Sequence, residues 1–366
     1  MKVIFAGGGT GGHINPALSV ANYMKSQDSE FEALFIGTQR GLEKKLVPQA
    51  GYNIEYIDIV GFDRRNLLKN VSVLKKLSQS RKRCREIIKR FNPDAVVCTG
   101  GYVSGPVAMA AHKLKIPSII HEQNVYPGLT VKGSVNYVDY VAVSFEETIK
   151  FIKKKGKCVV TGNPVRQEII NSDYKKAREE LGVGDKPLVL IFGGSLGAAK
   201  INENVTEILK KLSDDNKVSV IFGTGERNFE EISKKISGVS LREDIKVLPY
   251  INNMHLAMAA ADLVVSRSGA ITLSEIAVLS KPSVLIPSPN VVRNHQEQNA
   301  REFENHGAAV VICENELTPD VLYSKINELV SKPDKLLDMG KKAKKLSNPD
   351  ALGDIYKTIL RAIEKN

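Results

Sequence analysis

The chain has 366 residues, of which 42% are hydrophobic and 25% charged, a composition typical of a folded globular protein of about two domains. A mainly disordered chain is therefore excluded. No apolar stretch approaches the roughly 18 residues that span a membrane, and the first residues lack the pattern of a secretion signal, so a cytoplasmic protein is expected. Four cysteines without C-x-x-C spacing argue against a disulfide framework and a zinc site.

Short β-rich runs alternate with helical patterns along the whole chain, which predicts an α/β fold with parallel sheets. The first series of expected strands covers residues 3–6, 32–37, 54–59, 94–100, 117–121, 140–144 and 158–162. The pattern then restarts with a strand that runs into glycines over 187–200. Further strands are expected at 218–223, 244–250, 262–269, 282–287 and 308–312.

The restart predicts two similar doubly wound domains, one of residues 1–165 and one of residues 166–346. The last segment, 347–366, carries apolar residues at helical spacing. It is expected to form a closing helix that returns to the first domain.

A glycine-rich stretch, AGGGTGGHINP over residues 6–16, follows the first expected strand. Gly7, Gly9 and Gly12 match the G-x-G-x-x-G fingerprint of dinucleotide-binding proteins, but that fingerprint also needs an acid at the end of the second strand. Here the second strand ends in FIGTQR, which contains no acid, so the dinucleotide fingerprint is incomplete. The stretch is therefore interpreted as a phosphate-binding loop. His13 follows at the expected start of a helix, where the positive helix end favours a neutral imidazole able to accept a proton. The alternative is a histidine that only hydrogen-bonds the loop.

Seven motifs in order resemble the MurG family of bacterial cell-wall glycosyltransferases, glycosyltransferase family 28. They are GGGTGGHINPAL (7–18), GGYVSGP (100–106), HEQN (121–124), GNPVR (162–166), GGSLGA (193–198), SRSGAITLSE (266–275) and NHQEQNA (294–300). The resemblance implies the GT-B fold, in which two Rossmann-like domains face a cleft. It also implies inverting transfer of N-acetylglucosamine from UDP-N-acetylglucosamine to the C4 hydroxyl of the muramoyl sugar of lipid I, giving lipid II and UDP.

The resemblance assigns the site residue by residue, with His13 as the base. The implied donor-binding residues are Thr10, Gly11, Gly12, Asn124, Arg166, Ser195, Ile251, Ala270, Ile271, Thr272, Leu273, Ser274, Glu275 and Gln296. The acceptor-binding residues are Gly100, Gly101, Tyr102 and Ser104, and their loop is expected to cradle the lipid diphosphate together with the first glycine loop. The sequence has no D-x-D, so neither a metal at the active site nor a cofactor is expected.

Several of these residues have a second interpretation. Thr272 and Glu275 have the spacing of a capping box, whereas the family pattern implies that Glu275 accepts the ribose hydroxyls. Arg166 is expected to reach phosphate or to form an interdomain salt bridge. Gln296 is implied to contact the N-acetylglucosamine, with Asn299 as a second candidate, or else these residues cap a helix. His121 is expected to order its loop.

Residues 64–90 hold eleven basic side chains and one acid, so most of the net charge of +11 lies in one segment. Its apolar residues recur at helical spacing, which predicts an amphipathic helix whose basic face binds an anionic membrane surface. The protein is therefore expected at the cytoplasmic side of the cell membrane as a peripheral protein, with no nucleic-acid partner. The alternative is a solvated charged face over an ordinary core stripe.

Two other functions stay open from the sequence. One is a related GT-B transferase with another lipid acceptor, such as diacylglycerol. The other is a nucleotide-sugar or nucleic-acid binding protein without turnover, which the basic segment alone would suit.

Overall fold

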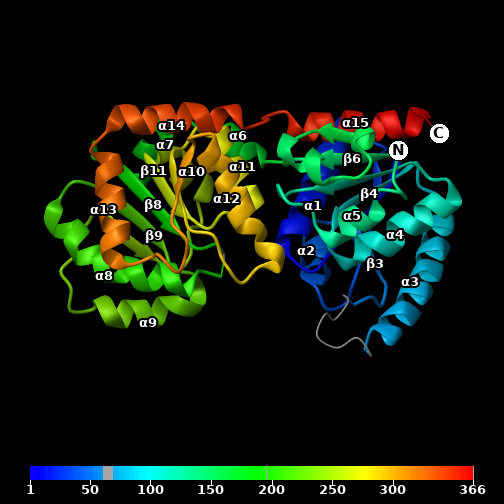
Figure 1. The fold of residues 1–366 in the computed structure, drawn as a ribbon, viewed down its shortest axis with the longest axis horizontal. Coiled ribbons are helices and arrows are strands. Elements are labelled where there is room, and N and C mark those ends of the chain that lie inside the picture. Colours follow the sequence, from blue (N-terminus) through cyan, green and yellow to red (C-terminus); the bar gives the residue numbers. More distant parts are fainter. Residues whose placement is uncertain (61–68, 195, 366) are drawn as a thin grey trace. The chain divides into compact units, whose positions relative to one another are not determined.

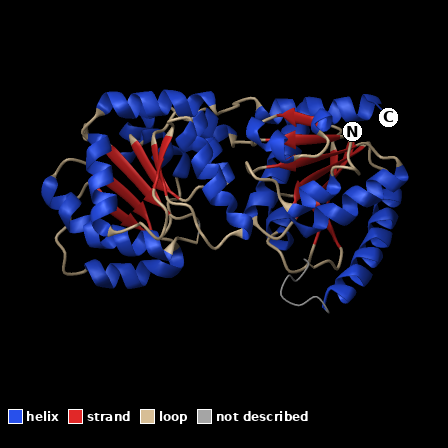
Figure 2. Ribbon diagram, in the orientation of Figure 1, coloured by secondary structure: helices blue, strands red, loops and turns tan. Residues whose placement is uncertain are grey.

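The computed structural model describes residues 1–60, 69–194 and 196–365. The chain divides into two compact units, which we call unit 1 (Met1–Pro164 with Asp350–Asn366) and unit 2 (Val165–Pro349). Each unit is a parallel sheet covered by helices, as Figures 1 and 2 show. The predicted α/β fold is confirmed, and every strand expected from the sequence is present in the described residues.

Unit 1 has a seven-stranded sheet with the order β3-β2-β1-β4-β5-β6-β7. Its strands are β1 (Lys2–Gly7), β2 (Glu32–Gly37), β3 (Asn53–Tyr56), β4 (Ala95–Gly100), β5 (Ser118–Glu122), β6 (Tyr140–Val143) and β7 (Cys158–Val160). Its helices are α1 (Gly11–Gln27), α2 (Glu43–Gln49), α3 (Lys69–Phe91), α4 (Gly101–Leu114), α5 (Leu129–Ser134) and α15 (Ala351–Lys365), with short 3-10 turns at Glu146–Phe151 and Lys155–Lys157.

Two apolar layers enclose the central strands of this sheet, because successive side chains of a strand point to opposite faces. In β1, Val3 and Phe5 face a cluster built with α1 and α15, while Ile4 and Ala6 face a cluster built with α3, α4 and α5. The closing helix α15 packs against α1 and β5, so the end of the chain belongs to unit 1.

Unit 2 has a six-stranded sheet with the order β10-β9-β8-β11-β12-β13. Its strands are β8 (Leu188–Phe192), β9 (Ser219–Gly223), β10 (Ile245–Leu248), β11 (Leu263–Ser266), β12 (Ser283–Leu285) and β13 (Ala309–Val311). Its helices are α6 (Gln167–Ile170), α7 (Tyr174–Leu181), α8 (Ala199–Asp215), α9 (Glu226–Ile236), α10 (Met254–Ala260), α11 (Ala270–Val278), α12 (His295–Asn305), α13 (Pro319–Val330) and α14 (Pro333–Lys345).

In both units, β1 and β8 lie inside the sheet at the point where the strand order reverses. The loops that follow such strands form the usual ligand-binding edge of an open parallel sheet. The glycine motifs of residues 7–12 and 193–198 both follow these strands. No helix in the described part of the chain is long and apolar enough to cross a bilayer.

Candidate active site

The first glycine loop joins β1 to α1 at the carboxyl edge of the unit 1 sheet. Gly9 has φ +90°, a value that favours glycine, and Thr10 precedes the first helical residue without capping it through its side chain. The backbone N–H groups of Gly11 and Gly12 have no acceptor among the described residues. The start of α1 therefore presents unpaired donors and the positive end of a 17-residue helix.

The second glycine loop lies directly against the first. Gly101 has φ +76°, and a Cβ atom on it would lie 2.3 Å from the carbonyl oxygen of Gly8, so a side chain at this position would push the two loops apart. The contact brings the N-terminus of α4 to the N-terminus of α1. Neither helix has an acidic residue in its first turn. Two helix ends of positive potential thus meet at one place, an arrangement suited to a phosphate or diphosphate.

His13 lies between the two loops, in the first turn of α1, with its imidazole against the backbone of Gly100. Its Nδ1 is 3.1 Å from the carbonyl oxygen of Gly8 and 3.3 Å from Thr10 Oγ1. A carbonyl oxygen only accepts, so the bond to Gly8 requires the hydrogen on Nδ1. In the neutral ring, Nε2 is then the nitrogen that accepts a proton, as a general base must.

Ser104 corrects one prediction, because its side chain is fully buried rather than placed to contact an acceptor. Its hydroxyl is 2.9 Å from the Ala6 carbonyl and 2.8 Å from the Gly100 carbonyl, and it accepts from the Gly100 amide at 3.0 Å. The hydroxyl is used within the protein, so Ser104 holds the glycine loop from beneath. Tyr102, in contrast, is 60% exposed at the start of α4.

The HEQN segment ends β5 and supports the same edge of the sheet. His121 is buried, its Nε2 lies 3.0 Å from the Gly162 carbonyl, and Gln123 Nε2 lies 3.0 Å from its Nδ1. Burial lowers the pKa of His121 to about 4, so the ring is neutral and connects two loops, which is the ordering role expected from the sequence. Asn124 donates to Glu122 from its amide and its side chain, at 2.9 and 3.1 Å.

The glycine loop of unit 2 joins β8 to α8. Ser195 lies outside the described residues. Gly194 and Gly197 have φ +98° and +75°, and a Cβ atom on Gly197 would lie 2.1 Å from the carbonyl oxygen of Thr224. Only a glycine allows this close approach to the loop that follows β9.

Helix α11 begins at Ala270 with Gly269 as its N-cap residue. Thr272 is therefore inside the first turn, three residues after the N-cap position, and the capping-box interpretation is wrong. Ala270, Ile271 and Thr272 form the first turn, followed by Leu273, Ser274 and Glu275.

Glu275 is 8% exposed, and Arg166 Nη2 lies 3.4 Å from its Oε1. Arg166 thus pairs with a residue of its own unit.

The loop before α12 has a strained backbone, because Arg293 and Asn294 both have positive φ, at 57° and 52°. Gln296 Oε1 accepts from the amide of Ser288 at 2.9 Å. Asn299 is buried and its Nδ2 donates to the Ser268 carbonyl at 3.2 Å. The N-cap residue of α12 is Asn294, so neither Gln296 nor Asn299 caps the helix.

Ile251 is 7% exposed in the loop after β10, and its side chain packs beside Gly223. A cavity of about 500 Å³ in unit 2 has none of the predicted donor-binding residues in its lining. It is lined by Lys200, Pro287, Pro289, Asn294, Glu297, Cys313, Glu314, Asn315 and Glu316. Among the described residues, no group of three acidic, histidine or cysteine side chains is arranged to hold a metal ion.

Helix α3 has its apolar stripe in the core of unit 1, since Cys84, Ile87 and Ile88 are buried there. The alternative interpretation is therefore correct about the apolar residues, which form an ordinary core stripe.

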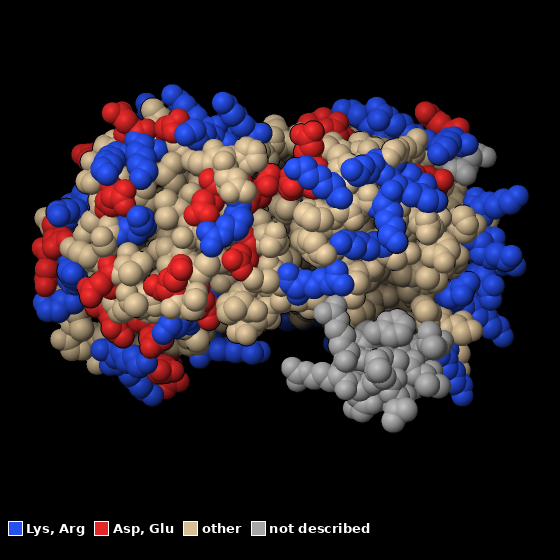
Figure 3. Space-filling model, viewed as in Figure 1, with Lys and Arg blue, Asp and Glu red and all other residues tan. Residues whose placement is uncertain are grey.

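The basic side chains of α3 lie on the outside of the helix, where Figure 3 shows blue atoms along the edge that α3 occupies in Figure 1. Some are paired: Arg83 and Arg90 contact Glu55, and Lys76 contacts Asp58. The exposed ones without an acidic neighbour among the described residues are Lys75, Arg81, Lys82 and Lys89. Residues 64–68 of the basic segment lie outside the described residues.

Sequence reasoning missed three residues that shape the unit 1 site. Glu43 is fully buried and accepts from the Gly9 amide at 2.9 Å. Thr99 Oγ1 donates to the His13 carbonyl at 2.7 Å, and Gln123 Nε2 donates to the Thr99 carbonyl at 2.9 Å. In the sequence, Glu43 is marked only by its position soon after two glycines, Gly37 and Gly41. This pattern is too general to predict its contact with Gly9, 34 residues away.

Two parallel-sheet units, each with a glycine loop after the strand where its order reverses, form the GT-B architecture of nucleotide-sugar glycosyltransferases. Family models agree with this class. The model of the glycosyltransferase family 28 N-terminal domain matches residues 3–143, and that of the family 28 C-terminal domain matches residues 188–355. The chain belongs to glycosyltransferase family 28, and the resemblance inferred from its motifs is confirmed.

Curated relatives cover the whole chain. A protein of Acetivibrio thermocellus is 48% identical over 100% of this chain and 99% of its own length. A protein of Clostridioides difficile is 41% identical over 99% of this chain and 89% of its own length. Both are named UDP-N-acetylglucosamine–N-acetylmuramyl-(pentapeptide) pyrophosphoryl-undecaprenol N-acetylglucosamine transferase.

Solved structures share the fold. A crystal structure of Acinetobacter baumannii MurG has a TM-score of 0.80 and 29% identity, covering 98% of this chain and 99% of its own. A UDP-N-acetylglucosamine 2-epimerase from Neisseria meningitidis, bound to UDP-N-acetylglucosamine, has a TM-score of 0.67 at 15% identity, covering 99% of this chain and 100% of its own. The second likeness is one of fold alone.

Proposed function

We propose that the chain transfers N-acetylglucosamine from UDP-N-acetylglucosamine to the C4 hydroxyl of the muramoyl sugar of lipid I, giving lipid II and UDP. Relatives 41 to 48% identical over nearly the whole chain bear the name of this activity. The observation that carries the proposal within the structure is the position of His13, a histidine whose Nδ1 lies 3.1 Å from the Gly8 carbonyl oxygen, between two phosphate-type loops.

In the reaction, His13 Nε2 takes the proton of the acceptor hydroxyl while its oxygen attacks C1 of the donor sugar. The bond between C1 and the phosphate oxygen breaks, UDP leaves with the electron pair, and the configuration at C1 inverts. A group that takes the proton during attack makes the hydroxyl a better nucleophile. The fixed tautomer supports this role, since the ring needs no rotation before it accepts the proton.

The two units divide the substrates. Unit 1 holds the acceptor, with its diphosphate at the joined N-termini of α1 and α4 and with Gly100, Gly101 and Tyr102 along the loop. Unit 2 holds most of the donor: the diphosphate lies near α8 and α11, and the ribose hydroxyls bond to Glu275. Thr10, Gly11, Gly12 and Asn124 of unit 1 are proposed as further contacts of the donor.

The acceptor is anchored in a lipid surface, so the enzyme works as a peripheral protein on the cytoplasmic face of the membrane. The exposed basic side chains of α3 support this location, because each cationic group near an anionic bilayer contributes about 1 kcal/mol.

One experiment tests the activity. UDP release is measured with UDP-N-acetylglucosamine and a lipid I analogue, with diacylglycerol, or with no acceptor. UDP release is expected with the lipid I analogue and not in the other two reactions. Release with diacylglycerol instead would show a transferase with another acceptor. No release with either acceptor would show a binding protein without turnover.

A further inference from the structure

A buried carboxylate lies beneath the first glycine loop and has not been assigned a role so far. Glu43, the first residue of α2, is 0% exposed. No lysine or arginine among the described residues pairs with it. Its carboxylate is held instead by three donors: Oε2 accepts from the Gly9 amide at 2.9 Å, and Oε1 accepts from the amide and the hydroxyl of Thr38 at 2.9 and 2.7 Å.

The surrounding backbone makes room for this carboxylate. A Cβ atom on Gly8 would lie 2.8 Å from Glu43 Oε1, and one on Gly41 would lie 2.0 Å from Oε2. A Cβ atom on Gly37 would lie 2.6 Å from Glu43 Cγ. Glycines from the first glycine loop and from the connection between β2 and α2 thus form a cradle for this side chain. A buried charge costs free energy unless it is well hydrogen-bonded. The Glu43 carboxylate is therefore expected to have a role other than packing.

Glu43 and His13 are connected through a single peptide unit, the one between Gly8 and Gly9. The Gly9 N–H that Glu43 binds and the Gly8 carbonyl that His13 binds belong to the same peptide bond. This bond is trans, so its N–H and C=O point in opposite directions within one rigid plane. Glu43 holds one end of the plane and the imidazole Nδ1–H of His13 is bonded to the other end.

We infer that Glu43 is a positioning residue for His13 and acts on it through the Gly8–Gly9 peptide. This inference rests on the proposed function only for its catalytic consequence. The carboxylate fixes the orientation of the peptide and polarises it, since hydrogen bonds in a chain strengthen one another. The Gly8 oxygen becomes a better acceptor, which keeps the proton of His13 on Nδ1 and makes Nε2 the nitrogen that accepts the substrate proton.

The arrangement also limits what the loop binds. The Gly9 amide is occupied by Glu43, so it is not among the donors offered to a phosphate. The anion is left to Gly11, Gly12 and the start of α4.

The test measures the tautomer of His13 and the kinetics separately. In protein labelled with ¹⁵N-histidine, the protonated and unprotonated ring nitrogens give distinct NMR signals, and the His13→Ala variant identifies those of His13 among the six histidines. The wild type is expected to show the hydrogen on Nδ1. Glu43→Gln, which turns one acceptor into a donor, is expected to mix the two tautomers, to lower kcat by about 10- to 100-fold and to keep KM for UDP-N-acetylglucosamine within about twofold.

Thr38→Val is the matched control. It removes one hydrogen bond to Glu43 Oε1 and leaves the bond to Gly9, so the His13 signals and kcat are expected to stay as in the wild type. Equal effects of Thr38→Val and Glu43→Gln would overturn the inference, as would unchanged His13 signals in a folded Glu43→Gln variant. If Glu43→Gln does not fold, the wild-type spectrum decides, because a hydrogen found on Nε2 contradicts the inference without any variant. The NMR result holds whether or not lipid I is the acceptor.

Discussion

Arg166 and Glu275 form an ion pair in which an exposed guanidinium covers an almost buried carboxylate, with Nη2 3.4 Å from Oε1. Burial raises the pKa of Glu275, and the neighbouring Arg166 counters this in part. Glu275 lies in the second turn of α11, where its side chain does not satisfy the backbone at the start of the helix. The carboxylate therefore contributes little to the start of the helix, as its proposed role in binding the ribose requires.

Glu275→Gln is expected to weaken UDP binding by about 10- to 100-fold, because hydrogen bonds to a charged group are worth about 1.5–3 kcal/mol. Isothermal titration with UDP measures the loss. The melting temperature is expected to change little, since a long pair with an exposed arginine stabilises by less than about 1 kcal/mol. A large drop in melting temperature with unchanged UDP affinity would instead give Glu275 a structural role.

His13→Ala is expected to lower kcat by about 100- to 10,000-fold, the range that a positioned general base contributes. Binding of UDP-N-acetylglucosamine is expected to persist, because most of the proposed donor contacts lie in unit 2. Steady-state kinetics and titration with the sugar nucleotide measure the two effects. Gln27→Ala, at the exposed far end of the same helix, is the control. Turnover close to wild type in His13→Ala would rule out the base.

The buried Lys281 is expected to make the free energy of unfolding depend on pH. It is 8% exposed, its Nζ donates to the carbonyls of Ala259 and Ala261, and burial lowers its pKa from 10.5 to about 8. Between these values the unfolded chain keeps the proton that the folded chain has lost, so the free energy of unfolding rises with pH. Relative to Lys281→Met, wild type is expected to gain about 3 kcal/mol across that range in denaturant titrations. Parallel pH curves for the two proteins would contradict this.

Binding to anionic vesicles tests the exposed face of α3. Changing Lys75, Arg81, Lys82 and Lys89 to glutamate is expected to weaken binding by about 100-fold or more, and salt is expected to weaken binding of the wild type. Lys76 and Arg83 are left unchanged because acids already neutralise them. A charge-matched control changes Lys175, Lys176, Lys341 and Lys345 of unit 2. Equal losses in both variants would show attraction by net charge rather than a docking face.

The strands were predictable because strands buried on both faces appear in the sequence as short apolar runs that end in glycine or proline. Side-chain roles at the site were harder. Thr272 looks like a cap in the sequence, but the chain turns into α11 at Gly269. Ser104 looks available, yet its hydroxyl turns back to Gly100 and Ala6. These outcomes depend on contacts between distant segments, which spacing along the chain does not encode.

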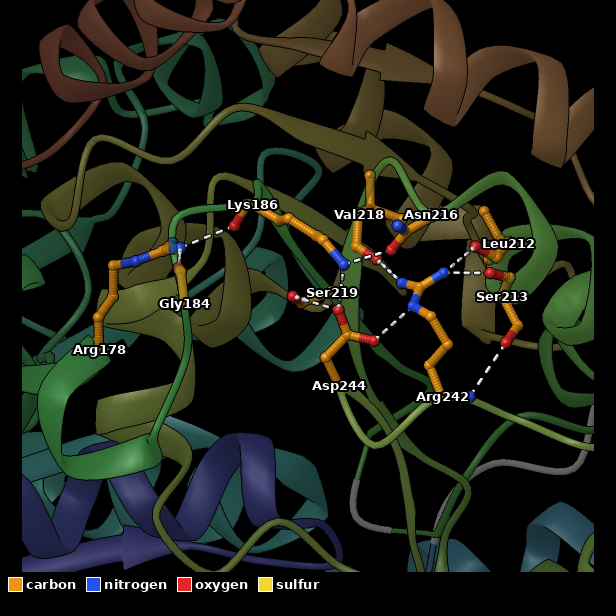
Figure 4. A network of polar contacts seen from close by, with 10 residues as sticks. All are labelled: Arg178, Gly184, Lys186, Leu212, Ser213, Asn216, Val218, Ser219, Arg242 and Asp244. Atoms are coloured by element: carbon orange, nitrogen blue, oxygen red, sulfur yellow. Dashed lines mark hydrogen bonds and ion pairs between the residues drawn. The ribbon is translucent and has the colours of Figure 1, made fainter.

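Arg242 lies at the amino end of β10, which is the edge of the unit 2 sheet opposite the glycine loop that follows β8. Figure 4 shows the network of polar contacts around it. Its guanidinium donates to Asp244 at 2.9 Å, to Val218 at 2.7 Å and to the carbonyls of Leu212 and Ser213 that end α8. Burial would raise the pKa of Asp244, but the hydrogen bonds from Arg242 and Lys186 outweigh it and lower the pKa.

Arg242→Met removes the donors to three backbone carbonyls and is expected to cost about 2–3 kcal/mol of unfolding free energy. Arg242→Lys is expected to lose less stability, because an ammonium keeps the charge beside Asp244 but not the planar fork that reaches both α8 and the residue before β9. Denaturant titration measures both variants, with the exposed Lys234→Met as a control expected to change stability by less than about 0.5 kcal/mol. UDP affinity is expected to stay the same in all three, since the network lies at the edge away from the glycine loop. A loss of UDP affinity without a loss of stability would place Arg242 in the binding site instead.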